Sequence, residues 1–191
     1  MTAPVTMIEE PQTEELRDLY ERLSQGGLGL GVLNLFKVLA HSPNLMRSYL
    51  RFGTTFFTPE VTLSPRLREI AVLRVGQLTR SEYEFAQHVR IALMAGLTVE
   101  EIAGLQDYDE TESFSDLERA VIQYTDAVSS LSDDVSELAR GLKRWLSERE
   151  LLELTLAIGH WNMVARILVP LEVELDEALV AELPTEWREW M

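Results

Sequence analysis

The chain repeats one short helix-start signal four times, and this repetition constrains its fold more than any other feature. The signal is the capping box, in which a Ser or Thr is followed three residues later by Glu, so that both side chains satisfy free backbone N–H groups at the helix start. The four pairs are Ser81 with Glu84, Thr98 with Glu101, Ser115 with Glu118, and Ser147 with Glu150. Apolar residues at helical spacing follow each pair, which predicts four helices that begin at these positions.

Apolar periodicity and proline predict the remaining helices. They lie at 16–23 before Gly26 and Gly27, at 33–40, from Pro43 after Ser42, from Pro65 after Ser64 to about Leu78, and at 134–146. No stretch alternates with the period of a strand over a useful length. We therefore expect an all-α helical bundle.

The predicted helix from Ser147 to about Val169, which Pro170 terminates, carries apolar residues on nearly every side. A helix of this kind is usually buried all round. In a chain of 191 residues, this is easiest to arrange if another subunit covers part of the helix, so we expect a homo-oligomer. The Trp-bearing end of the chain is interpreted as a swapped arm or a frayed end. We interpret residues 1–191 as one helical domain, with a core at 43–176, N-terminal helices at 13–41 and a tail at 177–191.

Charge and the absence of cysteine exclude several classes of function. The formal net charge is −15, from 32 acidic and 17 basic residues, and this charge repels nucleic-acid phosphates and an anionic membrane surface. A chain without cysteine has no disulfide, no thiolate metal ligand and no dithiol redox chemistry. Residues 1–11 resemble no targeting signal, and no segment reaches the ~18 apolar residues of a membrane span. We expect a cytoplasmic protein that binds neither nucleic acid nor membrane.

Two of the predicted helices must fold back on each other. Only Thr79 and Arg80 separate the helix before them from the helix that Ser81 caps, so the pair forms an antiparallel hairpin at the centre of the bundle. At about 1.5 Å per residue, Glu69 lies about 15 Å before the turn and His88 about 11 Å after it. The two side chains are therefore expected to meet at nearly the same height.

The second helix of this hairpin carries candidate acid–base residues on one face. Ser81, Glu84 and His88 are three and four residues apart, so they share that face, with Tyr83 at its edge. A carboxylate beside an imidazole orients the ring and raises its pKa, while a dry pocket raises the pKa of a carboxyl group. We predict that Glu69, Glu84 and His88 are catalytic residues that move protons without any cofactor.

The residues of this hairpin also point to a family. Segments 68–75, 81–89, 95–98 and 101–102 have the sequences REIAVLRV, SEYEFAQHV, AGLT and EI, and GHWNM stands at 159–163 in a later helix. Over about 43–176 the chain resembles the carboxymuconolactone decarboxylase-like family, which includes the alkylhydroperoxidase D-like (AhpD-like) proteins. The resemblance implies an AhpD-like bundle that assembles as a trimer or hexamer.

One departure from the family's peroxidase branch decides the expected chemistry. In that branch a Cys-x-x-Cys motif occupies the positions of Ser81 and Glu84, and a glutamate and a histidine matching Glu69 and His88 complete a proton relay. A hydroxyl and a carboxylate cannot run a dithiol cycle, so we expect no thiol peroxidase activity. The lactone decarboxylases also lack the cysteine pair and carry a Glu and a His at positions like Glu84 and His88, which favours a non-redox reaction.

Further residues are assigned to substrate binding. They are Ser81 at the helix start, Tyr83, Arg74 as a partner for a carboxylate, and Trp161 and Asn162 as pocket lining. Arg90 is an alternative to Arg74. Structural explanations stay open beside these roles: a capping box alone explains Ser81 and Glu84, and an ion pair alone explains Glu69. A metal site at Glu84 and His88 lacks a dense ligand set, so we expect no metal.

Two functions of different classes follow. The first is a cofactor-independent decarboxylase, or a related lyase or isomerase, that acts on a small carboxylated lactone or similar organic acid. The second is a non-catalytic, oligomeric binding or assembly protein on the same scaffold. A pocket at His88 favours the first, whereas a closed, dry hairpin favours the second.

Overall fold

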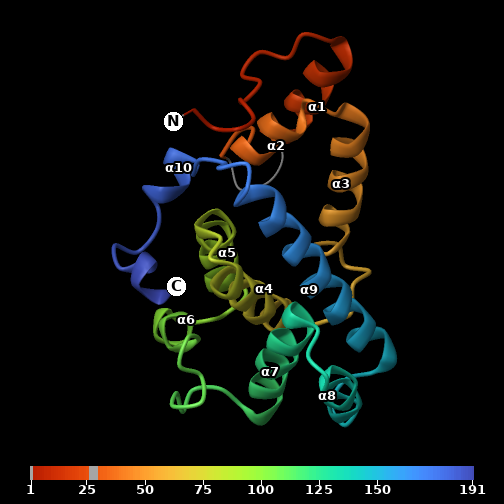
Figure 1. Cartoon of the computed structure of the whole chain (residues 1–191), viewed down its shortest axis with the longest axis vertical. Helices are drawn as coiled ribbons and strands as arrows, with labels where there is room; N and C mark the ends of the chain where they lie inside the picture. The colour runs from red at the N-terminus through yellow and green to blue at the C-terminus, as the bar shows by residue number, and fades with distance from the viewer. Residues whose placement is uncertain (1, 26–29) are drawn as a thin grey trace.

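All regular elements of the protein are helices, as Figure 1 shows for the computed structural model, which describes residues 2–25 and 30–191. They are α1 (Glu14–Gln25), α2 (Asn34–Leu39), α3 (Pro43–Thr55), α4 (Pro65–Thr79), α5 (Glu82–Met94), α6 (Val99–Gly104), α7 (Asp116–Ser130), α8 (Val135–Leu142), α9 (Glu148–Leu168), α10 (Glu177–Val180) and the 3-10 helix η1 (Trp187–Trp190). No strand occurs among the described residues. The predicted all-α fold is confirmed; the predicted stop at Gly26 and Gly27 lies outside the described residues.

The helix starts follow two kinds of local signal. Complete capping boxes begin α6, α7 and α9, as the sequence predicts. Proline occupies the first turn of α3 and α4, but neither preceding serine makes a side-chain hydrogen bond to the helix. At these two starts the fixed φ of proline, rather than a serine cap, favours the helical conformation.

The hairpin of α4 and α5 lies at the centre of the bundle. Arg80 closes the end of α4 in the left-handed conformation, with φ 53°, and Ser81 follows directly as the cap of α5. Gly76 allows the two helices to approach closely, because a Cβ at this position would lie 3.2 Å from the Cβ of Phe85. α4 contacts α7 and α9 as well as α5, and most of its side chains are therefore buried.

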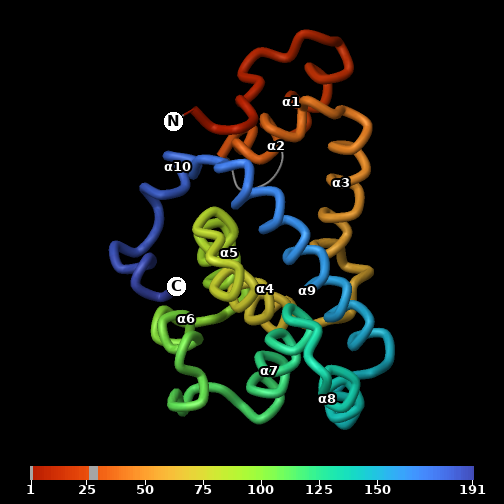
Figure 2. Tube along the Cα trace, in the orientation of Figure 1, coloured from red at the N-terminus to blue at the C-terminus, as the bar shows by residue number. Residues whose placement is uncertain are grey.

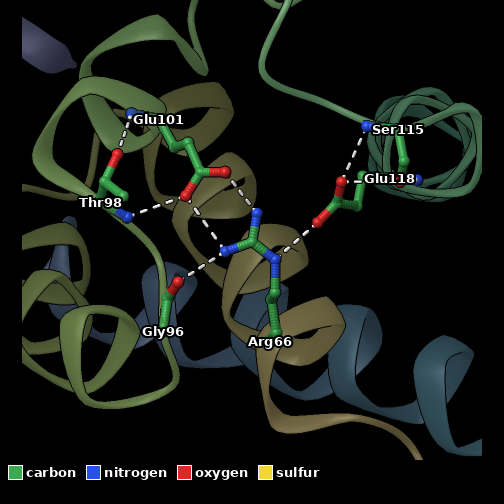
Figure 3. A network of polar contacts seen from close by, with 6 residues as sticks. All are labelled: Arg66, Gly96, Thr98, Glu101, Ser115 and Glu118. Carbon is green, nitrogen blue, oxygen red and sulfur yellow. Dashed lines mark hydrogen bonds and ion pairs between the residues drawn. The ribbon is translucent and has the colours of Figure 1, made fainter.

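A network of hydrogen bonds and ion pairs around Arg66 connects the hairpin to α6 and α7. Arg66 of α4 donates hydrogen bonds to Glu101 of α6 and Glu118 of α7 (Figure 3). Each glutamate also bonds the backbone N–H of its own N-cap residue, Thr98 or Ser115, at 2.8 Å. The two capping boxes thereby hold α6 and α7 against α4, and we call these three side chains the Arg66 cluster.

α9 is buried on one side and open on the other. Figure 1 shows it running diagonally beside the central hairpin, against which it packs Leu154, Ile158 and Trp161. On the other side, Leu152, Leu156 and Met163 are 59%, 43% and 44% exposed. In the single chain the helix is thus not buried all round, and the homo-oligomer stays a prediction. None of the helices in the described part of the chain combines the length and apolar character that crossing a membrane requires.

The C-terminal segment packs on its own chain. Figure 2 traces it from α9 through α10 to η1 along one flank of the molecule, where it contacts α5 and α6. Trp187 and Trp190 are buried in the main hydrophobic core, and Gln77 donates a hydrogen bond to the Trp190 carbonyl at 2.6 Å. The expectation of a swapped arm or a frayed end is wrong, because burial of the two indole rings anchors the segment.

Candidate active site

The hairpin brings Glu69, Glu84 and His88 together, as their positions along the two helices predict. The His88 Nδ1–H donates to Glu69 Oε2 at 2.6 Å, and His88 Nε2 lies 3.3 Å from Glu84 Oε1. All three side chains are buried. We call them the His88 cluster; its geometry is that of a relay in which one ring bridges two carboxyl groups.

Glu84 belongs to the cluster because it does not complete its capping box. Ser81 accepts the N–H of Glu84, but the Ser81 N–H already donates to the Gly76 carbonyl at 3.0 Å. This bond closes the end of α4, so the N-cap amide has no need of a carboxylate partner. The Glu84 side chain turns instead toward His88. Because of the tight hairpin turn, Glu84 is therefore available to contact His88 and does not cap the helix.

Glu69 is compensated by a buried arginine. Arg68 Nε donates to Glu69 Oε1 at 2.7 Å, and its Nη1 donates to the Phe56 carbonyl at 2.7 Å. The Arg68 guanidinium also lies over the Phe57 ring. Because a buried carboxylate is stable only when paired and hydrogen-bonded, the contacts with Arg68 offset the cost of burying Glu69 beside His88.

The His88 cluster binds its protons tightly. Burial by itself lowers the pKa of His88, but the charge and hydrogen bond of Glu69, together with those of Glu84, outweigh burial and raise this pKa to about 9. Burial raises the pKa of Glu84, against the opposing effect of His88. His88 and Glu84 therefore both favour a bound proton, and the pair retains one proton between the two side chains at neutral pH.

A pocket of about 400 Å³ opens on this cluster. Glu84 and His88 line it, whereas Glu69 lies behind the imidazole. Tyr83 and Trp161 line it too. Its walls are mainly apolar or aromatic and include Leu35, Phe36, Tyr49, Phe57, Ile91 and Val164. A mainly apolar cavity with a few polar groups at one wall is the usual form of a small-molecule site.

Three predicted contacts lie elsewhere. Arg74 forms two hydrogen bonds with Asp126, at 2.6 and 2.9 Å, and Arg90 pairs with Glu182. Asn162 donates to Ser129 Oγ and the Ile158 carbonyl. The expectation that these side chains reach the pocket is wrong, because they do not line it and their polar groups bind Asp126, Glu182 and Ser129 instead. Ser81 caps α5 and does not line the pocket.

The sequence did not reveal several residues of the pocket. Tyr49 lies on a helix for which the sequence predicted no site residue, and Gln87 precedes His88 on α5 but was not among the residues predicted there. His160 also lines the pocket; burial is the main cause that lowers its pKa to about 4, so its ring is neutral. Arg22 of α1 reaches the rim and is exposed. No sequence signal could have found Arg22, because its approach depends on how α1 folds over α3.

A second buried network fixes the orientation of the pocket's polar wall. The Tyr83 hydroxyl donates to Asp176 at 2.5 Å, and the Gln87 amide donates to the same oxygen at 3.0 Å. Asp176 also accepts the backbone N–H of Asn34 at the start of α2.

Across residues 2–25 and 30–191, no three His, Asp or Glu side chains gather in a way that could hold a metal ion.

The arrangement of the helices is an AhpD-like fold. Residues 43–127 match the sequence profile of the Carboxymuconolactone decarboxylase family, and this span contains Glu69, Glu84 and His88. The match supports the resemblance seen in the sequence and extends over that region of the chain. Among curated proteins, no sequence matches the chain.

Solved structures share the fold at low sequence identity. An uncharacterized peroxidase-related protein from Silicibacter sp. TM1040 has a TM-score of 0.81 at 15% identity, covering 93% of each chain. An uncharacterized peroxidase-related protein with an AhpD core, from Ralstonia eutropha JMP134, has a TM-score of 0.76 at 13% identity, covering 94% of this chain and 95% of that chain. The debrominase Bmp8 has a TM-score of 0.77 at 15% identity over 100% of both chains, and a Bmp8 variant is also known in complex with 2,3,4-tribromopyrrole.

Proposed function

We propose that the protein is a cofactor-independent decarboxylase, or a related lyase or isomerase that moves a proton, and that its substrate is a small carboxylated lactone or similar organic acid. The observation that carries this proposal is the His88 cluster at one wall of a pocket of about 400 Å³. A buried acid–base pair that retains a proton at neutral pH is suited to proton transfer. The apolar walls favour a substrate whose ring or chain is mostly uncharged.

The proposed reaction balances without an oxidant or reductant. The bond between the substrate carboxylate and the carbon next to a carbonyl breaks, CO₂ leaves, and the electron pair stays on the substrate as an enolate. The enolate carbon then takes one proton from the Glu84–His88 pair, which regains it from water. For a substrate with a second carboxylate, the exposed guanidinium of Arg22 at the rim is the suited partner, in place of Arg74.

Thiol chemistry is not part of the proposal. The chain has no cysteine, so no residue can attack a peroxide bond or accept electrons from a dithiol. The peroxidase-related names of two structural relatives therefore support only the scaffold. The Bmp8 complex with a small ring compound supports the idea that this scaffold accommodates a ligand of that size.

The test is a screen of small lactone and keto acids in D₂O. NMR would follow loss of the substrate and incorporation of deuterium at the protonated carbon. We expect turnover of at least one carboxylated lactone, and a loss of roughly 100-fold or more in His88→Ala. His41→Ala is the matched control, because His41 contacts the Thr6 carbonyl at the surface and lies away from the pocket.

Two results would overturn the proposal. One is the absence of both turnover and saturable binding across the panel by a folded protein, which would favour a binding or assembly role for the scaffold. The other is equal turnover by folded His88→Ala and the unchanged protein.

A further inference from the structure

His88 Nε2 contacts two side chains, one of which requires this nitrogen to be unprotonated and the other of which requires it to carry hydrogen. The Trp161 indole N–H donates to His88 Nε2 at 2.8 Å, and Glu84 Oε1 lies 3.3 Å from the same nitrogen. An indole N–H can only donate, so this bond requires an Nε2 without hydrogen. An ionised Glu84 can only accept, so its contact requires an Nε2 that carries hydrogen. Both demands cannot be met together while Glu84 is ionised.

Two arrangements hold the same number of protons. In the first, His88 is an imidazolium whose Nε2–H donates to an ionised Glu84, and the Trp161 N–H faces another N–H. In the second, His88 is neutral with hydrogen on Nδ1, its Nε2 lone pair accepts the Trp161 N–H, and the other proton lies on Glu84. The arrangements differ only in whether this proton sits on Nε2 or on Oε1, and in both Nδ1–H donates to Glu69 at 2.6 Å.

Trp161 cannot easily leave this position. Its ring is buried and packs against Phe56, His160 and His88, with ring centroids 5.1, 5.0 and 5.2 Å away. If the indole N–H lost its bond to His88, it would become a buried donor without an acceptor, which is unfavourable. The packing of Trp161 therefore favours the second arrangement.

We propose that Trp161 is a positioning residue that keeps hydrogen off His88 Nε2 and thereby places the shared proton on Glu84, so that Glu84, and not His88, is the acid that faces a ligand. The inference rests on the proposed function and deepens it. It names the ligand chemistry as well: the neutral Glu84 carboxyl donates to a carbonyl or carboxylate oxygen, which an ionised Glu84 would repel.

The charged surroundings agree with this assignment. α4 contributes Arg68 and Glu69, whose charges offset each other at 2.7 Å. α9 contributes His160, which is neutral because burial lowers its pKa to about 4. Tyr49 of α3 is also uncharged, because burial raises the pKa of its hydroxyl. Burial raises the pKa of Glu84 in turn, which favours the protonated carboxyl.

The test is ¹⁵N NMR of the histidine rings at neutral pH, without ligand. The chain has three histidines, so His41→Gln and His160→Gln assign the signals of His88. We expect Nδ1 of His88 to carry hydrogen and Nε2 to show the shift of an unprotonated acceptor. A protonated Nε2 in the unchanged protein at neutral pH would overturn the proposal, whatever the variants do.

Trp161→Phe supplies the second measurement. It keeps an aromatic ring but removes the N–H, so we expect Nε2 to gain hydrogen at neutral pH. Turnover should then fall roughly 10-fold through kcat rather than KM, with a shifted pH profile. Trp145→Phe is the control, because Trp145 stacks with Arg144 outside the pocket. An unchanged Nε2 signal in folded Trp161→Phe would contradict the proposal.

The outcomes separate the two proposals. The NMR assignment needs no substrate, so an unprotonated Nε2 together with a failed substrate screen would reject only the proposed reaction. Turnover together with a protonated Nε2 would reject only the role of Trp161.

Discussion

Two clusters in the described part of the chain hold one basic side chain between two glutamates, and the His88 cluster is the one that lines the pocket of about 400 Å³. In the Arg66 cluster the guanidinium bonds Glu101 at 2.5 Å and Glu118 at 2.6 Å (Figure 3). In the His88 cluster the imidazole contacts Glu69 at 2.6 Å and Glu84 at 3.3 Å. Both clusters join the central hairpin to its surroundings and both use a glutamate from a capping-box sequence.

The difference lies in the central group and in burial. Arginine keeps its charge at every accessible pH, so the Arg66 cluster has one protonation state. Hydrogen bonding by Arg66 lowers the pKa of Glu101; for Glu118, the bonds of Ser115 and Arg66 outweigh burial and lower its pKa as well. Histidine can lose its proton, and deeper burial raises the pKa of Glu84 instead. A similar three-part geometry thus makes a structural clamp in one place and a candidate proton relay in the other.

The largest expected effect concerns activity. Glu84→Gln removes the group that holds the shared proton, so turnover should fall roughly 100- to 10,000-fold. Glu150→Gln is the matched change in a capping box that only caps, and glutamine serves there nearly as well as glutamate. Steady-state assays on any substrate from the screen provide the measurement. Equal losses in both variants would mean that Glu84 acts only through helix stability.

The next effect is on the free energy of unfolding. Glu69→Gln leaves the buried Arg68 charge without its counter-ion, so we expect a loss of about 3–5 kcal/mol. Glu118→Gln leaves Arg66 paired with Glu101 near the surface, and the loss should stay below about 1 kcal/mol. Urea denaturation followed by circular dichroism measures both. A smaller loss for Glu69→Gln than for Glu118→Gln would show that the comparison is wrong.

The stability that the His88 cluster contributes should be lost at alkaline pH, whereas the stability that the Arg66 cluster contributes should be lost at acid pH. The pKa of His88 is raised from 6.5 to about 9, so the stability that comes from the proton shared by His88 and Glu84 is complete below pH 6.5 and is lost as pH rises toward 9, by on the order of 3 kcal/mol. The raised pKa of Glu84 acts with the same sign. The lowered pKa values of Glu101 and Glu118 contribute stability that is lost in acid instead.

Variants separate this effect from the general repulsion of a chain with net charge −15. Urea denaturation across pH 5 to 10 should show a flatter alkaline decline for His88→Gln than for the unchanged protein. Glu101→Gln should flatten the acid decline only. Parallel alkaline curves for His88→Gln and the unchanged protein would exclude a raised His88 pKa.

The smallest expected effect is the difference in unfolding free energy between the loss of the Ser147 cap and the loss of the Ser81 cap. Ser147→Ala removes a hydroxyl that accepts the Glu150 N–H and donates to the Glu150 carboxylate. Ser81→Ala removes only the acceptance of the Glu84 N–H, at 3.4 Å. Both losses should fall within about 0.5–2 kcal/mol, with Ser81 at the lower end. Thermal and urea unfolding of the two variants, compared directly, would show whether the order is reversed.

The sequence by itself determined the starts of the helices from α2 to α9 and the meeting of Glu69 with His88, but it did not predict α10 or η1. These features are local: a capping box acts over four residues, apolar spacing acts within one helix, and the two-residue turn after α4 leaves the hairpin no other arrangement. The absence of cysteine also settled which chemistry is excluded before any geometry was known.

Only the tertiary structure decided the direction of Glu84, the neighbours of Arg74 and the walls of the pocket. Glu84 turns inward because a hydrogen bond from Ser81 to Gly76 already satisfies the amide it would cap, and Arg74 faces α7 because Asp126 is there. Trp161 reaches His88 across 73 residues of sequence. Such contacts depend on how whole helices pack, and no spacing within one helix encodes which of its faces will meet a distant partner.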